Sequence, residues 1–179
     1  MNGILSRLNA VFAFGMWVCT GMTFLTFLVT VGIDMTRPHD LAIHNAKVSL
    51  ARDPHGPNAK QDLASFTFDL EVDTTPLFHW NNKQLFMYLL AEYETHQNDI
   101  NQVIVWDKII MRGEKSNLQI KNKPLKYKFF DDGAGGLKEN SDIKLTLYYN
   151  TVPNAGLLRI VKAIGGTSLA LGDYASKRI

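Results

Sequence analysis

The sequence predicts one N-terminal transmembrane helix followed by an all-β domain, an antiparallel β-sandwich. Three observations predict this fold class. A long stretch near the N-terminus, Leu8 to Ile33, carries no charged side chain. The chain after it contains several segments in which apolar and polar residues alternate, and clusters of glycine, proline, asparagine and aspartate separate most of them. This is the pattern of short strands joined by turns.

The uncharged stretch from Leu8 to Ile33 predicts a helix that crosses a membrane. At ~1.5 Å per residue, a helix of this length more than covers the ~30 Å hydrocarbon core of a bilayer. A cleaved secretory signal is the alternative, but its apolar core is only ~7–15 residues long and small residues mark its cleavage site. The sequence from Val31 to Met35 lacks such a site. We therefore expect an uncleaved signal-anchor at residues 8–33.

The charges on either side of the stretch predict its orientation. Arg7 and the amino terminus precede it, whereas the charges of Asp34, Arg37 and Asp40 nearly cancel after it. The positive-inside rule then keeps residues 1–7 in the cytosol and sends residues 34–179 across the membrane. We expect a single-pass type II protein whose C-terminal domain lies, in a eukaryote, in the lumen of the endoplasmic reticulum.

Alternation of apolar and polar residues predicts the strands of this domain. Leu63 to Val72 and Ile143 to Tyr149 alternate strictly, which indicates one buried face. Leu41 to Leu50 changes phase, which indicates a β-bulge. Leu85 to Ala91 and Val103 to Ile110 are apolar at nearly every position, so we expect burial on both faces. Weaker candidates are Leu118 to Ile120, Tyr127 to Phe130 and Leu157 to Val161, and the chain after Ile164 resembles a loosely held tail.

Residues for catalysis or metal binding are not grouped in any pattern that indicates an enzyme. The five histidines are scattered, and none stands at metal-ligand spacing from another ligand on a predicted rigid element. They are His39, His44, His55, His79 and His96. The only cysteine, Cys19, lies inside the uncharged stretch. With 19 basic and 17 acidic residues and no basic block, nothing favours nucleic acid as a partner. We expect no catalytic residue, no cofactor and no metal.

Two groups of residues are candidates for contacts with partner proteins. Trp80, Asn81, Lys83 and Gln84 form a polar segment around a large aromatic residue, which is typical either of a structural corner or of the rim of an interface. In the uncharged stretch, Thr20, Thr23 and Thr30 share one helical face. Such a face suits helix pairing in a membrane, although each threonine can also bond to its own helix.

Several blocks of sequence together resemble subunit 3 of the eukaryotic signal peptidase complex, the 22/23-kilodalton subunit family. The resemblance runs nearly from end to end. It is carried by FHWNNKQLFMYLL (78–90), INQVIVWDKIIMRG (100–113), YKFFDDG (127–133) and NTVPNAG (150–156). The chain departs from the family at Asn82, where an aliphatic residue is usual, and it lacks the family's glycosylation acceptor because it has no Asn-x-Ser/Thr sequence.

This resemblance implies a function that the residues alone do not give. It implies a non-catalytic, architectural subunit in the endoplasmic reticulum membrane. A catalytic serine-protease subunit and other small membrane subunits would be its partners, and the complex would remove signal peptides from nascent secretory and membrane proteins. A membrane-anchored lumenal module that binds cargo or a lipid-linked ligand is the alternative, and it predicts a concave apolar pocket.

Overall fold

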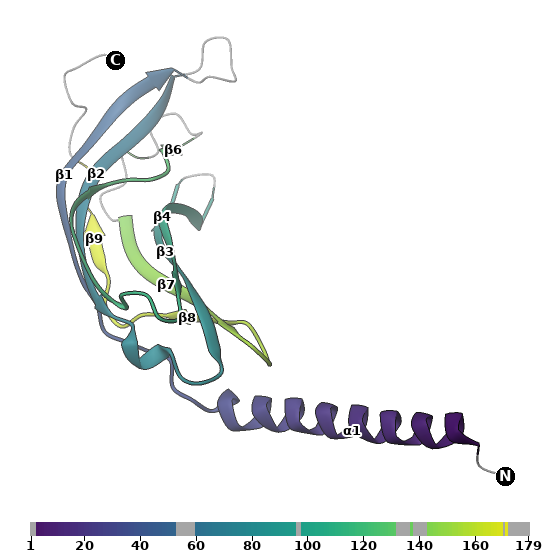
Figure 1. Cartoon of the computed structure of the whole chain (residues 1–179). Helices are drawn as coiled ribbons and strands as arrows, with labels where there is room; N and C mark the ends of the chain where they lie inside the picture. The colour runs from purple at the N-terminus through teal and green to yellow at the C-terminus, as the bar shows by residue number, and fades with distance from the viewer. Residues whose placement is uncertain are drawn as a thin grey trace.

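The structure, a computed structural model, describes residues 3–52, 60–95, 98–131, 137, 143–169 and 171. Helix α1 (Ile4–Val31) projects from one end of a β domain formed by the rest of the described chain (Figure 1). Within the described residues, α1 is the single helix long and apolar enough to cross a membrane. Nearly all of its side chains are exposed, and Thr30 alone is buried. A helix that is apolar on every side is suited to lipid surroundings.

The first sheet is antiparallel and has β2 at its centre. Its strands are β1 (Asp40–Arg52), β2 (Lys60–Asp73), β5 (Asn117–Pro124) and β6 (Phe129–Asp131). Strand β1 pairs with one edge of β2, while β5 and β6 pair with the other. The predicted alternation in β2 is confirmed, because Ala64, Phe66, Phe68, Leu70 and Val72 are all buried. The predicted bulge in β1 is also confirmed: the register shifts between His44 and Lys47, and Asn45 adopts a φ of 54°.

The second sheet is also antiparallel, in the order β4-β3-β7-β8, with β9 pairing the first residues of β7. Its strands are β3 (Asn82–Tyr93), β4 (Asn101–Met111), β7 (Ile143–Pro153), β8 (Arg159–Lys162) and β9 (Thr167–Leu169). A short 3-10 helix, η1 (Thr75–Leu77), leads from the first sheet into β3. Ile143, Leu145, Leu147 and Tyr149 are fully buried, which confirms the alternation predicted for β7.

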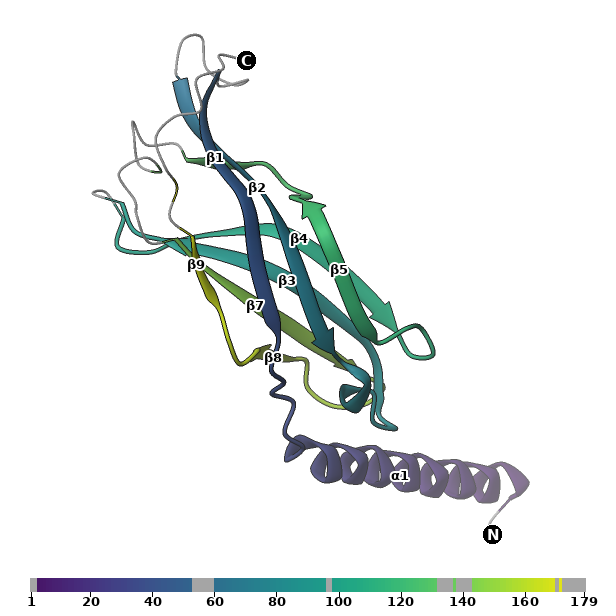
Figure 2. The ribbon, with the colours of Figure 1, turned by 90° about the vertical axis from the view of Figure 1, so that its left-hand side faces the viewer.

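The two sheets lie face to face and enclose one apolar core, so the predicted β-sandwich is confirmed (Figure 2). Phe68 of the first sheet meets Trp106 of the second edge to face, with ring centroids 5.7 Å apart. Tyr93 and Phe129 make a second aromatic contact between the sheets, at 5.4 Å. Such contacts add to the free energy gained by burying the rings. Each strand points one row of side chains into this core and the other row to an outer face of the sandwich.

The expectation that Val103 to Ile110 is buried on both faces is wrong for the isolated chain. Val105, Trp106 and Ile110 are buried, but Ile104 is 40% exposed and Ile109 is 52% exposed. The reason is that β4 is an edge strand, with β3 on one side of it and no strand of the described chain on the other. In β3 the same face is partly covered, with Phe86 and Tyr88 half-buried. The apolar residues on the second side of β4 therefore form part of an exposed apolar face of the sheet.

The chain after Ile164 contains a strand that no pattern in the sequence predicts. Thr167–Leu169 form β9 and pair with Ile143–Leu145 of β7, and the Thr167 hydroxyl donates a 2.7 Å hydrogen bond to the Leu41 carbonyl. A bridge between Pro38 and Ile164 holds the same region to the start of the domain. Residues 165–169 thus belong to the sandwich, in contrast to the expectation of a loosely held tail after Ile164, and residues 172–179 lie outside the described residues.

Candidate interaction surfaces

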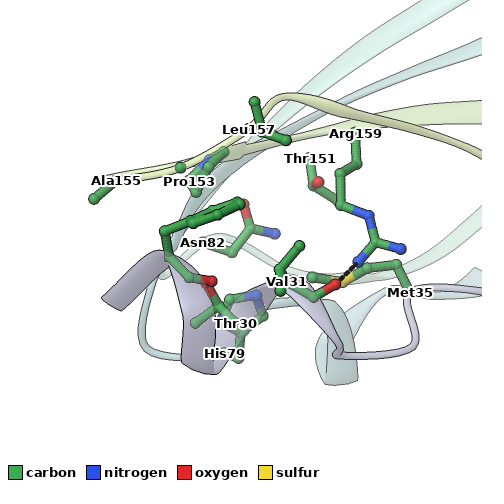
Figure 3. Close-up of a pocket in the computed structure, with 12 residues that line it drawn as sticks. Thr30, Val31, Met35, His79, Asn82, Thr151, Pro153, Ala155, Leu157 and Arg159 are labelled. Carbon is green, nitrogen blue, oxygen red and sulfur yellow. Dashed lines mark hydrogen bonds between the residues drawn. The ribbon is translucent and has the colours of Figure 1, made fainter. Parts of the chain in front are cut away.

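The C-terminal end of α1 is bound to the sandwich by side-chain hydrogen bonds. Arg159 at the start of β8 donates to the Val31 carbonyl at 3.0 Å and to the Ile33 carbonyl at 2.9 Å (Figure 3). A cation at this position satisfies carbonyls that have no partner within the helix and interacts favourably with the helix dipole. The buried Tyr149 hydroxyl donates to the Met35 carbonyl in the linker. These contacts connect the helix end and the linker to strands of the second sheet.

Asn81 provides the second connection between helix and domain. It is 1% exposed, and its amide nitrogen donates to the Thr30 hydroxyl at 3.1 Å and to the Ala155 carbonyl at 2.7 Å. Its amide oxygen accepts from the Ala155 N–H at 3.1 Å, and its backbone carbonyl accepts from Asn154 at 2.7 Å. One buried side chain therefore joins α1, the turn before β3 and the β7–β8 connection. A buried amide whose hydrogen-bonding groups all have partners favours one relative arrangement of the segments that it connects.

The other residues of the predicted partner segment have different positions from Asn81. Trp80 is 58% exposed in the turn before β3, Lys83 is exposed, and Gln84 is half-exposed at the start of β3. Asn82 is buried, with its amide nitrogen donating to the Leu77 carbonyl at 2.8 Å, so the residue that departs from the family pattern has a local polar partner. The segment thus divides into an internal part and an exposed part, and only the exposed part is available to a partner protein.

The threonines of α1 all bond to their own helix. Thr20, Thr23 and Thr30 donate to the carbonyls four residues earlier at 2.9 Å, as does Thr26. Thr20 and Thr23 are exposed, whereas Thr30 is covered by the domain. Back-bonding satisfies each hydroxyl donor without a second helix. The exposed face of Thr20 and Thr23 stays a proposed site for a neighbouring helix.

An exposed apolar surface that the sequence analysis did not identify lies on the outer face of the second sheet. Strand register places Ile109, Phe86, Asn150 and Ile160 in one row across β4, β3, β7 and β8. The next row contains the stacked pair Tyr88 and Tyr148, with ring centroids 5.7 Å apart and Lys162 over the Tyr148 ring. Ile160 is 68% exposed. We call the set Phe86, Tyr88, Ile104, Ile109, Tyr148 and Ile160 the outer face.

The apolar residues of β4 that belong to the outer face are the ones whose sequence pattern predicts a strand buried on both sides. Val103 to Ile110 is apolar on both sides of the strand, which indicates that both sides avoid water in the working state of the protein. Contiguous apolar patches on soluble surfaces mark interaction sites. Gln84 lies in the row next to Phe86, paired with Met111 and Val152, so it adjoins the outer face at the end of β3 that follows Asn81. Trp80 and Lys83 precede it in the sequence and are exposed.

The described histidines do not form a reaction centre. His39 is buried at the end of the segment that joins α1 to β1, and burial lowers its pKa. His44 lies at the surface, 3.2 Å from Asp69, and the pKa of that carboxyl is lowered chiefly by a hydrogen bond from the Asn122 backbone. His79 accepts a 3.3 Å hydrogen bond from the Asn81 N–H, and burial followed by the charge of Arg112 lowers its pKa. His55 and His96 lie outside the described residues.

Metal and ligand sites are likewise not formed by the part of the chain that the structure describes. No group of three histidine, cysteine, aspartate or glutamate side chains lies close enough there to hold a metal ion. The hollow beside the end of α1 in Figure 3 has room for about 20 Å³, roughly one water molecule. A second, open hollow of about 260 Å³ is lined by apolar residues together with four charged ones, Asp40, Asp69, Glu71 and Lys121. The first hollow is too small for a ligand and the second carries four charged side chains, so neither matches the concave apolar pocket that the binding-module alternative predicts.

Comparison with known proteins gives a consistent set of similarities. A family model described as a signal peptidase subunit matches residues 1–173. The chain is 45% identical to signal peptidase complex subunit 3 of Gallus gallus, over 97% of this chain and 96% of that protein. It is 44% identical to the Homo sapiens protein of the same name, with the same coverage, and 43% identical to that of Drosophila melanogaster over the full length of both.

Proposed function

This chain belongs to the family of signal peptidase complex subunit 3, and from that premise we propose that it is a non-catalytic, architectural subunit of the signal peptidase complex in the endoplasmic reticulum membrane. In this proposal residues 1–7 are cytosolic, α1 is an uncleaved signal-anchor, and residues 34–179 form the lumenal domain. Its partners are a catalytic serine-protease subunit and the other small membrane subunits. The complex removes signal peptides from nascent secretory and membrane proteins.

The observation that carries the architectural role is the bound end of α1. Arg159 holds the Val31 and Ile33 carbonyls, and Asn81 joins Thr30 to the β7–β8 connection. A domain on a free linker would sample many heights and angles above a membrane, whereas these contacts favour one. A subunit with this junction can hold a partner's active site at a set distance from the membrane surface. Such a distance fixes the reach between the apolar helix of a signal peptide and its cleavage point.

The outer face supplies the surface for the partner. Apolar residues in this face, with Gln84 at its end and the exposed Trp80 and Lys83 just before Gln84 in the sequence, match the composition of protein interfaces, which have an apolar core and a polar rim. The apolar sequence of β4 is then explained, because both of its faces are covered in the complex. We propose that the catalytic subunit's lumenal domain packs on the outer face, and that α1 joins a cluster of membrane helices through the face containing Thr20 and Thr23.

A non-catalytic role is supported by the chemistry of the described residues. A hydrolase requires a nucleophile in contact with a base. Among the described residues, the serine hydroxyls with hydrogen bonds are Ser49, which donates to the Leu63 carbonyl, and Ser116, which bonds to Thr75. The described histidines contact neither. We therefore propose that this chain positions its partner and that the partner carries out the reaction.

Purification from detergent-solubilised membranes tests this proposal. The tagged chain is expected to co-isolate with a serine-protease subunit in equal amounts, and the isolated chain is expected not to cleave a signal-peptide substrate. Alanine at His39, His44, His55, His79 or His96 is expected to leave cleavage by the assembled complex within a few-fold of normal, far from the ~10²–10⁴-fold loss that follows removal of a general base. A folded monomer without the protease subunit would overturn the architectural role. A large loss in one histidine variant that still folds would overturn the non-catalytic role.

A further inference from the structure

The connection between β7 and β8 presents apolar side chains at the level of the last turns of α1. Leu157 is 63% exposed and Leu158 is 68% exposed, and both lie in the connection that follows Pro153. In both views of the ribbon this connection lies directly beside the C-terminal part of α1 (Figures 1 and 2). Exposed leucines in a tight connection are costly in water, because they add apolar surface that nothing in the described chain covers.

The depth of this connection is fixed by a contact with Phe27. A Cβ on Gly156 would lie 3.3 Å from Cδ2 of the Phe27 ring, and Gly156 adopts a φ of +124°, a conformation that favours glycine. At ~1.5 Å per residue, Phe27 lies ~9 Å along the helix axis before Ile33. A hydrocarbon core of ~30 Å that begins at Leu8 ends near Phe27, and one that ends at Ile33 extends past Phe27. For either placement of the helix, Gly156 lies at the hydrocarbon boundary or inside it.

The first residues of the connection, Asn154 and Ala155, have backbone groups that are hydrogen-bonded within the protein. In lipid, each N–H and C=O group needs a partner from the protein. Asn81 supplies such partners: its side chain accepts from the Ala155 N–H and donates to the Ala155 carbonyl, and its backbone carbonyl accepts from the Asn154 N–H. Arg159, the next residue after the two leucines, donates to the carbonyls at the end of α1. The backbone groups of Asn154 and Ala155 just before the leucines, and the carbonyls at the end of α1, therefore have partners from the protein, while the leucine side chains are exposed.

We propose that the β7–β8 connection is a second membrane contact of this protein, with Leu157 and Leu158 inserted into the lumenal leaflet beside α1. The occupant of this surface is lipid, because the connection is continuous with the exposed, lipid-facing surface of α1 through Phe27. The two contacts together set the orientation of the sandwich on the membrane, since one helix alone allows rotation about its axis. The proposal rests on the membrane span of α1 and does not depend on membership of the complex.

The test uses the full chain with Cys19→Ala in lipid nanodiscs, alone and in the purified complex. An environment-sensitive fluorophore is attached at Leu158→Cys, and at Ile100→Cys as a matched control. Ile100 is equally apolar and exposed, but it precedes β4 at the far end of the β3–β4 pair. A third label at Phe14→Cys, in the middle of α1, reports insertion of the helix itself.

The expected result is that lipid-borne quenchers reach the label at Leu158→Cys in the isolated chain. Iodide in solution should quench that label several-fold less than the label at Ile100→Cys, and its emission should be shifted to the blue. Equal iodide quenching at the two sites would overturn the proposal. Protection that occurs only in the complex would also overturn it, because a protein and not lipid would then cover the connection. Absence of lipid quenching at Phe14→Cys would instead overturn the membrane span on which the proposal rests.

Discussion

At the scale of single residues, Asn81 and Trp80 show how neighbours in the sequence take opposite roles. Asn81 is buried and bonds to the helix and to the β7–β8 connection, whereas Trp80 is 58% exposed. From the sequence both residues belong to one polar segment, because residue type does not show which side chain points inward. Turn geometry decides that direction, and here it separates adjacent residues.

Trp80→Ala is expected to leave the stability of the domain nearly unchanged and to weaken association with the catalytic subunit. An exposed side chain contributes little to the core, whereas a large aromatic residue at an interface can contribute about 2 kcal/mol or more of binding free energy. Phe68→Ala is the control, because Phe68 is fully buried and its truncation should cost ~3–5 kcal/mol of folding free energy. Melting temperature and co-purification are measured for both variants. If Trp80→Ala melts as early as Phe68→Ala, Trp80 is a structural residue.

His39 is expected to make the domain less stable as the pH falls below about 6.5. Burial lowers the pKa of His39 from its ordinary value of 6.5, and the neighbouring Ile164 backbone and the charge of Asp40 oppose this effect. Both ring nitrogens are buried without a hydrogen-bond partner. Below pH 6.5 the unfolded chain therefore binds more protons than the native chain, so the free energy of unfolding decreases until the pH reaches the lowered pKa of the folded state.

The measurement is the melting temperature of the purified chain between pH 7.5 and 5.5. The variant His39→Leu is expected to lose less stability over this range than the original chain. His79 also has a pKa lowered by burial and by Arg112, so the double variant with His79→Gln should show a still smaller dependence. The same loss in His39→Leu as in the original chain would show that other groups cause the pH dependence.

At the scale of elements, the informative case is β4. Its sequence predicted a strand covered on both sides, and the structure shows one side covered by the first sheet and the other open. The existence of the strand follows from local sequence, but the exposure of its outer side depends on what surrounds the sheet. This difference is the reason for the proposal that a partner covers the outer face.

Ile109→Asp is expected to weaken association with the catalytic subunit while the domain stays folded. Ile109 is 52% exposed in the row with Phe86 and Ile160, so a carboxylate there remains solvated in the isolated chain. In an apolar interface the same carboxylate would be desolvated without a partner, which costs several kcal/mol. Ile100→Asp is the control, since Ile100 is 72% exposed and precedes β4, outside the residues that form the outer face. Equal recovery of the protease subunit with both variants would exclude the outer face as its docking surface.

At the scale of the whole molecule, the contacts of Arg159 and Asn81 with the end of α1 determine how the domain is oriented relative to the helix. In Figure 1 the second sheet lies on the side of the sandwich along which α1 runs, so its outer face looks toward that side. A helix standing across a bilayer then places this face near the membrane surface. A partner held on the outer face would accordingly work close to the lipid, where a signal peptide leaves the bilayer.

Protease added to sealed microsomes is expected to leave residues 34–179 intact and to digest them only after detergent is added. The physical reason is the positive charge of Arg7 and the amino terminus, which keeps the short N-terminal segment in the cytosol. The mature protein should retain residues 1–33. Digestion of the domain in sealed vesicles would reverse the orientation, and a mature N-terminus near Asp34 would show that the segment is a cleaved signal.

The sequence by itself determined the elements whose signal is local. The uncharged stretch gave α1, and the period of two gave β2, β7 and the bulge in β1, because these patterns depend on near neighbours along the chain. Only the tertiary structure decided the pairing of β9 with β7, the burial of Asn81 beside the exposed Trp80, and the binding of Arg159 to the end of α1. Arg159 and Val31 are far apart in the sequence, so their contact depends on the packing of the whole domain. No local pattern records it.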